Sequence, residues 1–132
     1  MPESSHSTAH VLNLRQGRIR IELAWTRAGR DLSVTLSGGD RPHIGAVALS
    51  QPRPSHVEGG GTSASTSVIT LPGHKEDELA RSAAARLASA LDANVCVACG
   101  IHLDGIRPEE IAQVREMAGE LVEQLVDKLR EA

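Results

Sequence analysis

The sequence predicts an α+β domain in which an antiparallel sheet of about five strands carries two helices on one face. Residues 18–25 and 32–37 alternate polar and apolar side chains, which is the period of a strand with one buried face. Two later segments, residues 76–91 and 108–129, place apolar side chains every three or four positions, as amphipathic helices do. The expected order is β-β-β-β-α-β-α, arranged as an antiparallel meander.

Four strands are expected before the first helix. Residues 18–25 and 32–37 form a hairpin across the Gly29 turn, and residues 44–49 and 66–71 form the third and fourth strands. The intervening residues 51–65 are rich in Pro, Gly, Ser and Thr, which predicts a long flexible loop. A loop of this length in a small domain is either disordered or a lid over a site.

The helical part of the chain has clear start signals. Glu76, Asp77 and Glu78 fall in the first turn of the first helix, where they favour the positive end of its dipole. Residues 95–101 follow as a strand that is apolar on both faces, and therefore central. Pro108 suits the first position of the second helix. Val122 and Val126 widen the apolar face of that helix, and this width indicates a homodimer, although an ordinary core face would also account for it.

Composition limits the class of protein. The chain has 132 residues, of which 40% are hydrophobic and 23% are charged, so we expect one globular domain over residues 15–132 after a flexible tail over residues 1–14. A net charge of −3 makes nucleic acid an unexpected partner. No apolar run is long enough to span a membrane and no signal peptide is recognisable, so we expect a cytoplasmic protein.

The cysteines and aromatic residues are few. Cys96 and Cys99 resemble a CxxC pair, but they fall within a predicted strand, where positions three apart point to opposite faces. We therefore expect two inert, buried thiols and no disulfide. The chain has no Phe, no Tyr and one Trp, Trp25, so its core is aliphatic and a planar ligand has few aromatic side chains on which to stack.

Three histidines lie beside glycine or proline turns, whereas the other three lie in loose segments and are expected to be solvated. The first is in Gly38-Gly39-Asp40-Arg41-Pro42-His43-Ile44-Gly45, the second in Pro72-Gly73-His74-Lys75-Glu76 and the third in Gly100-Ile101-His102-Leu103-Asp104-Gly105-Ile106. Such junctions hold a polar ring in a fixed pose beside a ligand. We expect the three turns to converge on one pocket for an anion or a metal.

Each signature also has a specific interpretation. Gly38, Gly39 and Gly45 permit close backbone approach, and exposed amides in such a turn can face an anion. His74 and Lys75 open a helix, which is a ready anion site. His102 and Asp104 are two apart, so Asp104 could orient the His102 ring or share a metal with it. The alternative for each signature is a purely structural turn.

Metal binding is a second expectation for these residues. The chain has no paired spacing of the kind found in structural zinc sites. A divalent ion held by imidazole and carboxylate oxygen at His43, His74, His102 and Asp104 stays open.

Taken together, these motifs resemble those of the small accessory component of gallate decarboxylase, a family whose members are LpdD-like prenylated-flavin chaperones. The resemblance runs from about Arg18 to Leu129. It implies a non-catalytic accessory protein that binds prenylated FMN, or FMN, and delivers it to, or helps mature, a UbiD-type decarboxylase. Carried over by motif, the implied binding residues are Gly38, Gly39, Pro42, His43, Ile44, Gly45, His74, Lys75, His102 and Asp104.

Two other functions compete with this interpretation. One is a metal-dependent hydrolase or lyase in which His102 acts as the base and Asp104 orients it. The other is a purely structural component of a decarboxylase complex. Flavin binding separates the three functions, because only the chaperone must bind the cofactor without turning over a substrate.

Overall fold

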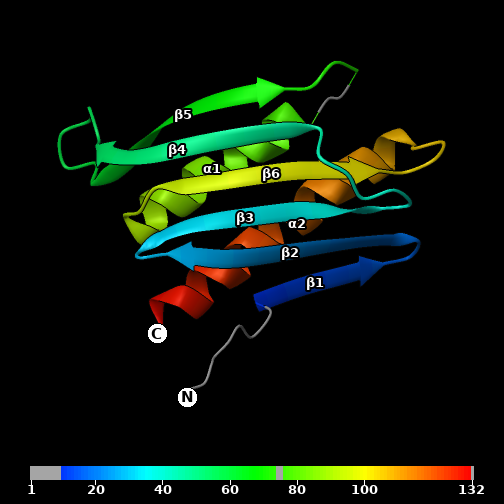
Figure 1. Ribbon diagram of the computed structural model, residues 1–132, viewed down its shortest axis with the longest axis horizontal. Helices are drawn as coiled ribbons and strands as arrows, with labels where there is room; N and C mark the ends of the chain where they lie inside the picture. The colour runs from blue at the N-terminus through cyan, green and yellow to red at the C-terminus, as the bar shows by residue number, and fades with distance from the viewer. Residues whose placement is uncertain (1–9, 74–75, 132) are drawn as a thin grey trace.

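The computed structural model describes residues 10–73 and 76–131, which form a two-layer α+β domain (Figure 1). Six strands build one sheet and two helices cover one of its faces. In chain order the elements are β1 (His10–Gln16), β2 (Ile19–Ala28), β3 (Asp31–Gly39), β4 (Ala46–Pro54), β5 (Thr62–Thr70), α1 (Asp77–Leu91), β6 (Val95–His102) and α2 (Pro108–Arg130). The predicted fold class, with both helices on one face, is confirmed.

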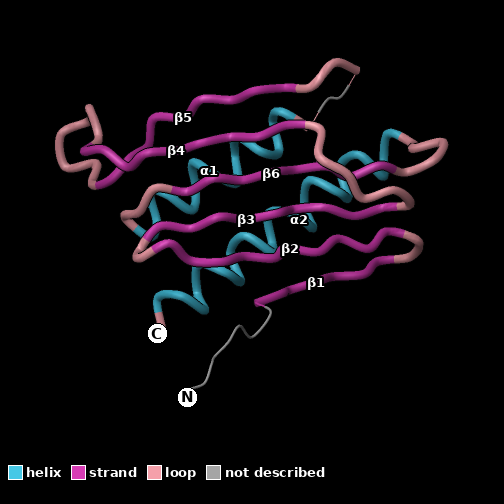
Figure 2. Tube along the Cα trace, viewed as in Figure 1, coloured by secondary structure: helices cyan, strands magenta, loops and turns pink. Residues whose placement is uncertain are grey.

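The sheet is mixed, however, and this corrects the predicted antiparallel meander of five strands. Its strand order is β1-β2-β3-β6-β4-β5, and β6 runs parallel to β3 while every other pair is antiparallel. Helix α1 carries the chain across β4 from β5 to β6, which places β6 between β3 and β4 (Figure 2). The strand predicted to be central is central, as its apolar residues on both faces indicated.

The sixth strand comes from the segment predicted to be a tail. Residues 10–14 belong to β1, so the flexible tail predicted for residues 1–14 is wrong for them, while residues 1–9 lie outside the described residues. Leu12 and Leu14 pack against the core from β1, and the ring of His10, which the sequence places in solvent, stacks on Trp25 with centroids 5.1 Å apart. Polar and apolar residues do alternate along β1, but the pattern includes only two half-buried apolar positions, Leu12 and Leu14, and it follows a Ser- and His-rich stretch. The segment therefore resembles a tail in sequence.

The loop predicted over residues 51–65 is also shorter than expected. Strand β4 continues to Pro54 and β5 begins at Thr62, so only residues 55–61 form the connection. Strand β6 pairs with β4 only as far as Ser50. Beyond that point β4 has a neighbour on one side only, so Pro52 and Pro54 lack an N–H where no second strand needs one.

The core lies between the sheet and the helices. Alternate residues of β2, β3 and β6 point into it, and α1 supplies mainly alanines. Val122 and Val126 of α2 are buried in this core, so the wide apolar face of α2 is used within one chain and gives no support to the predicted homodimer. Within the described residues, no helix is long and apolar enough to cross a membrane.

Candidate functional site

The candidate site lies where β3 and β6 end. Because β6 separates β3 from β4, residues 40–45 must pass around the carboxyl end of β6 to connect them. The N–H of Asp40 donates to the carbonyl oxygen of His102 at 2.6 Å, and that of Gly45 donates to Cys99 at 2.8 Å. Two histidine signatures that are far apart in sequence therefore lie against each other.

The glycines of both signatures make this close packing possible. Gly39 has φ +76°, and a Cβ there would collide with the carbonyl oxygen of His102. A Cβ on Gly100 would collide with the carbonyl of His43, and one on Gly45 would lie 2.6 Å from Oε2 of Glu76. These glycines thus allow backbone and side chains to approach where no other residue fits.

His43 connects the crossover with the residue that precedes α1. Its Nε2 lies 2.7 Å from Oε1 of Glu76, and its Nδ1 lies 3.0 Å from the carbonyl oxygen of Arg41. Glu76 immediately precedes α1 and is buried. From the sequence, Glu76 is recognisable only as an acidic residue at the start of a helix. Its contact with His43 could not be predicted, because the two residues are far apart in the sequence.

His102 contacts a different carboxylate, that of Asp104 in the turn after β6. Its Nε2 is 2.9 Å from Oδ1 of Asp104, which also accepts a hydrogen bond from Arg41 at 3.2 Å. The hydrogen bond with His102 lowers the pKa of Asp104, and the positive charge of Arg41 lowers it further. Asp104 is therefore an anion that orients the His102 ring, which is one of the two roles the spacing suggested.

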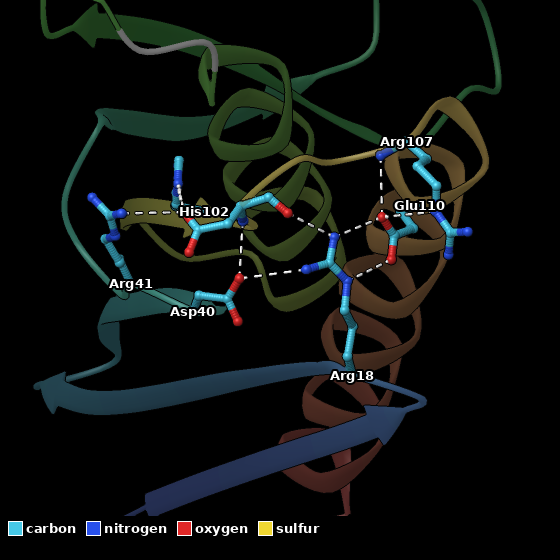
Figure 3. Close-up of polar contacts among 7 residues, drawn as sticks. Arg18, Asp40, Arg41, His102, Arg107 and Glu110 are labelled. Carbon is cyan, nitrogen blue, oxygen red and sulfur yellow. Dashed lines mark hydrogen bonds and ion pairs between the residues drawn. The ribbon is translucent and has the colours of Figure 1, made fainter.

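A charge network fixes the start of α2 beside these residues (Figure 3). Arg18 donates two hydrogen bonds of 2.8 Å to Glu110 and one of 2.9 Å to the carbonyl oxygen of Asp104. The N–H of Arg107 also donates to Glu110 at 3.1 Å. These bonds, that from Arg18 above all, lower the pKa of Glu110 to about 2. Sequence reasoning did not identify Glu110. Its position three residues after the helix boundary, as in a capping box, is the sequence feature that could have identified it.

A cavity of about 850 Å³ opens beside the two signatures, in the size range of small-molecule sites. Its apolar walls come from Ile44, Leu79, Ile101, Ile106, Ile111 and Val114, and its polar lining from Arg41, His43, Glu76, Glu78, His102 and Arg115. Helices α1 and α2 both begin at this end of the sheet, so both positive dipole ends face the region. The cavity therefore combines apolar walls with hydrogen-bond donors, carboxylates and the positive ends of two helix dipoles.

The predicted site residues are distributed unevenly around this cavity. His43, Ile44 and His102 line it, whereas Asp104 reaches it through His102, and Gly38, Gly39 and Gly45 act by letting the backbone pack. His74 and Lys75 lie outside the described residues, although their neighbours Gly73 and Glu76 line the cavity. Arg115 also lines it, and no local sequence signal marks this residue because it lies in the middle of a regular helix.

Comparison with known families decides the assignment. A model of the prenylated flavin chaperone LpdD-like domain matches residues 15–130. The chain belongs to the LpdD-like prenylated flavin chaperone family. A search among curated proteins returned no match.

The cavity of this LpdD-like chain fits the group that the family name implies. Aliphatic walls suit a planar ring system, and Arg41 and His102 would supply donors for its polar atoms. Trp25 is buried in the core and is not part of the lining, so the ring would pack on aliphatic side chains.

A metal site is not visible in the described part of this LpdD-like chain. Residues 10–73 and 76–131 contain no group of three or more His, Cys, Asp and Glu side chains arranged to hold an ion. His43 and His102 each face a separate carboxylate instead of sharing one centre.

The cysteines of the LpdD-like chain take no part in the cavity lining. Both are free thiols; Cys99 is buried, whereas Cys96 is half-buried and thus more accessible than expected. Burial, together with the nearby charge of Glu76, raises the pKa of Cys99 to about 12. Cys99 is therefore protonated and unreactive at neutral pH.

Proposed function

We propose that this chain is a non-catalytic carrier that binds prenylated FMN, or FMN, in the cavity beside β3 and β6 and delivers it to a UbiD-type decarboxylase. The observation that carries the proposal is the cavity of about 850 Å³ at the point where the two histidine signatures meet. The LpdD-like family match supports a chaperone of prenylated flavin. The decarboxylation chemistry would belong to the cofactor in the partner enzyme.

The lining suggests how the ligand would be held. Leu79, Ile101 and Val114 would pack against the faces of the isoalloxazine ring, while Arg41 and His102 would donate to its carbonyl edge. Asp104 would keep the His102 ring in place for this contact. Binding to aliphatic walls without aromatic stacking suits a carrier, which must also release its ligand.

The mouth of the cavity supports transfer to a partner. Ile44, Ile106 and Ile111 line the cavity and are each more than 40% exposed. Exposed apolar side chains in a group commonly mark a surface that another molecule covers. A decarboxylase docking at this mouth would cover them and receive the flavin without exposing it to water.

The proposal is tested by anaerobic titration of the protein with prenylated FMN, followed by absorbance and fluorescence. We expect stoichiometric binding, which His102→Ala weakens about tenfold by removing a hydrogen-bonded donor. His56→Ala is the matched control, because His56 is exposed in the β4–β5 connection and does not line the cavity. Binding should also raise the yield of active holo-decarboxylase from apoenzyme. A protein that ignores the flavin but co-purifies with the decarboxylase would instead be a structural component of the complex.

The contact between His102 and Asp104 also fits a second function, that of a hydrolase or lyase. At 2.9 Å the pair has the geometry of a base and its orienting carboxylate. In that case His102→Ala would abolish turnover of a substrate while leaving ligand binding largely intact. Loss of flavin binding without any turnover in the parent protein would argue against this alternative.

A further inference from the structure

We propose that Arg115 binds the phosphate of the flavin and that the ribityl phosphate chain runs from the large cavity into the groove between α1 and α2. This inference rests on the proposed function and assigns an orientation to its ligand. It gives a binding role to a residue that belongs to none of the histidine signatures.

Two cavities adjoin each other at Arg115. The second cavity, of about 430 Å³, lies between the helices and is lined by residues of α1 and α2 alone. Glu78, Leu79 and Arg115 line both cavities, so the smaller one lies directly beside the larger one. Arg115 thus lies at the junction, where a ligand that enters both cavities must pass its side chain.

The neighbouring arginines are already paired with carboxylates. Arg41 is paired with Asp104 at 3.2 Å, and Arg86 forms a bidentate pair with Glu123 at 2.7 and 2.9 Å. Arg115, by contrast, has no ion pair or side-chain hydrogen bond with any residue in ranges 10–73 and 76–131. Its guanidinium is therefore available for a phosphate, which it can bind in a bidentate manner.

The other positions for a phosphate carry negative charge. A phosphate beside His43 would meet the buried carboxylate of Glu76, which lies 2.7 Å from that ring. One beside His102 would meet Asp104 at a similarly short distance. A dianion is disfavoured next to either carboxylate. Glu78 and Glu123 are carboxylates in the lining of the groove as well, but both are exposed, as Asp104 is, and Glu123 is paired with Arg86. The buried Glu76 is therefore the carboxylate that most disfavours a phosphate, because water screens the exposed ones.

The groove between the helices has small side chains along its walls. Ser82, Ala83 and Gly119 are among its lining residues, so part of the groove has no bulky side chain. A Cβ on Gly119 would meet no heavy atom within 4 Å, so the space above this residue is open. The slender ribityl chain suits this smaller groove of about 430 Å³, whereas the wider ring system matches the larger, aliphatic cavity of about 850 Å³.

The test compares prenylated FMN with the same flavin after phosphatase treatment, titrated anaerobically against three forms of the full chain. We expect the parent protein to prefer the phosphorylated flavin by about tenfold or more, since a charge-assisted contact is lost without the phosphate. Arg115→Gln should abolish this preference, and Arg81→Gln, an exposed α1 residue outside both cavities, should keep it. An Arg115→Gln protein that still prefers the phosphorylated flavin overturns the inference.

A groove-filling variant tests the orientation separately. Gly119→Leu fills open space on a helix, so it should fold well. Both flavins keep the ribityl chain, so the variant should weaken binding of both, and it should also reduce the preference for the phosphorylated flavin because the phosphate can no longer reach Arg115. Unchanged binding of both flavins would mean that the chain does not enter the groove. A parent protein that binds both flavins equally overturns the phosphate assignment alone, whereas one that binds neither overturns the proposed function as well.

Discussion

The two ends of the sheet use similar residues but do different things. At the end where β3 and β6 begin, the N–H of Asn94 donates to Asp31 at 2.9 Å and Leu32 donates to the carbonyl of Asn94 at 3.0 Å. These contacts join the turn before β6 to the start of β3, and β3 and β6 are already neighbours in the sheet. At the other end, residues 40–45 must pass around β6, and the large cavity lies beside this crossover.

The difference shows what makes a site in this fold. Glycines and acidic residues occur at both ends, so residue type alone does not distinguish them. The site end is the one where two parallel strands finish and both helices begin, which leaves space and directs the helix dipoles toward it. Substitutions at the site end should therefore affect flavin binding, whereas those at the other end should leave it unchanged.

The largest effect is expected from Gly100→Val at the site end. The new side chain would collide with the backbone of His43, and we expect a loss of about 2–3 kcal/mol in the free energy of unfolding, together with loss of flavin binding. Gly29→Ala at the other end meets no atom within 4 Å and strains only a positive φ of +64°, so it should cost about 1 kcal/mol and leave binding intact. Urea denaturation measures both. Equal losses for the two variants would contradict the comparison.

The second effect concerns acid stability. The folded-state pKa of Glu110, about 2, lies below its ordinary value of 4.5, because Arg18 and Arg107 stabilise the charged form. This contribution is fully present above pH 4.5 and is lost as the pH falls toward 2. Glu110→Gln should therefore lower stability at neutral pH and flatten the decline over that window. Asp92→Asn, in an exposed pair with Arg30 at 3.7 Å, should leave the profile unchanged.

The third effect is on ligand binding. Asp104→Asn removes the anion that orients His102 and should weaken binding of prenylated FMN about three- to tenfold, with little change in the melting temperature because Asp104 is exposed. Asp31→Asn is the matched change at the other end, and binding should not respond to it. Titration of both variants with the flavin checks the prediction, which fails if they behave alike.

The smallest effect is a gain in stability. Asp92 ends α1 with φ +51° and ψ +52°, a left-handed conformation that glycine adopts more easily. Asp92→Gly should raise the free energy of unfolding by about 0.5–1 kcal/mol without changing flavin binding, because it lies at the end away from the cavity. Thermal unfolding with and without the flavin measures both quantities. A change in binding would mean that the two ends are coupled.

Much of this structure follows from local sequence signals. The polar–apolar alternation of β2 and β3, the apolar stripes of α1 and α2 and the start of α2 at Pro108 are local patterns, and the structure confirms them. The glycine and histidine signatures identified which turns border the cavity. Strand β1 and the ends of β4 and β5 are not recognisable from the sequence, because these segments are short or polar and resemble loops.

By itself the sequence therefore determines most of the helices and strands and the polar residues at their ends that can bind a ligand, since both depend on neighbours along the sequence. The tertiary structure alone decides that β6 enters between β3 and β4, and with it that His43 meets Glu76, that Arg18 meets Glu110 and that Arg115 lies at the junction of two cavities. These outcomes depend on which distant segments pair, and the energy of that pairing is spread over the whole sheet and core rather than written in any one motif.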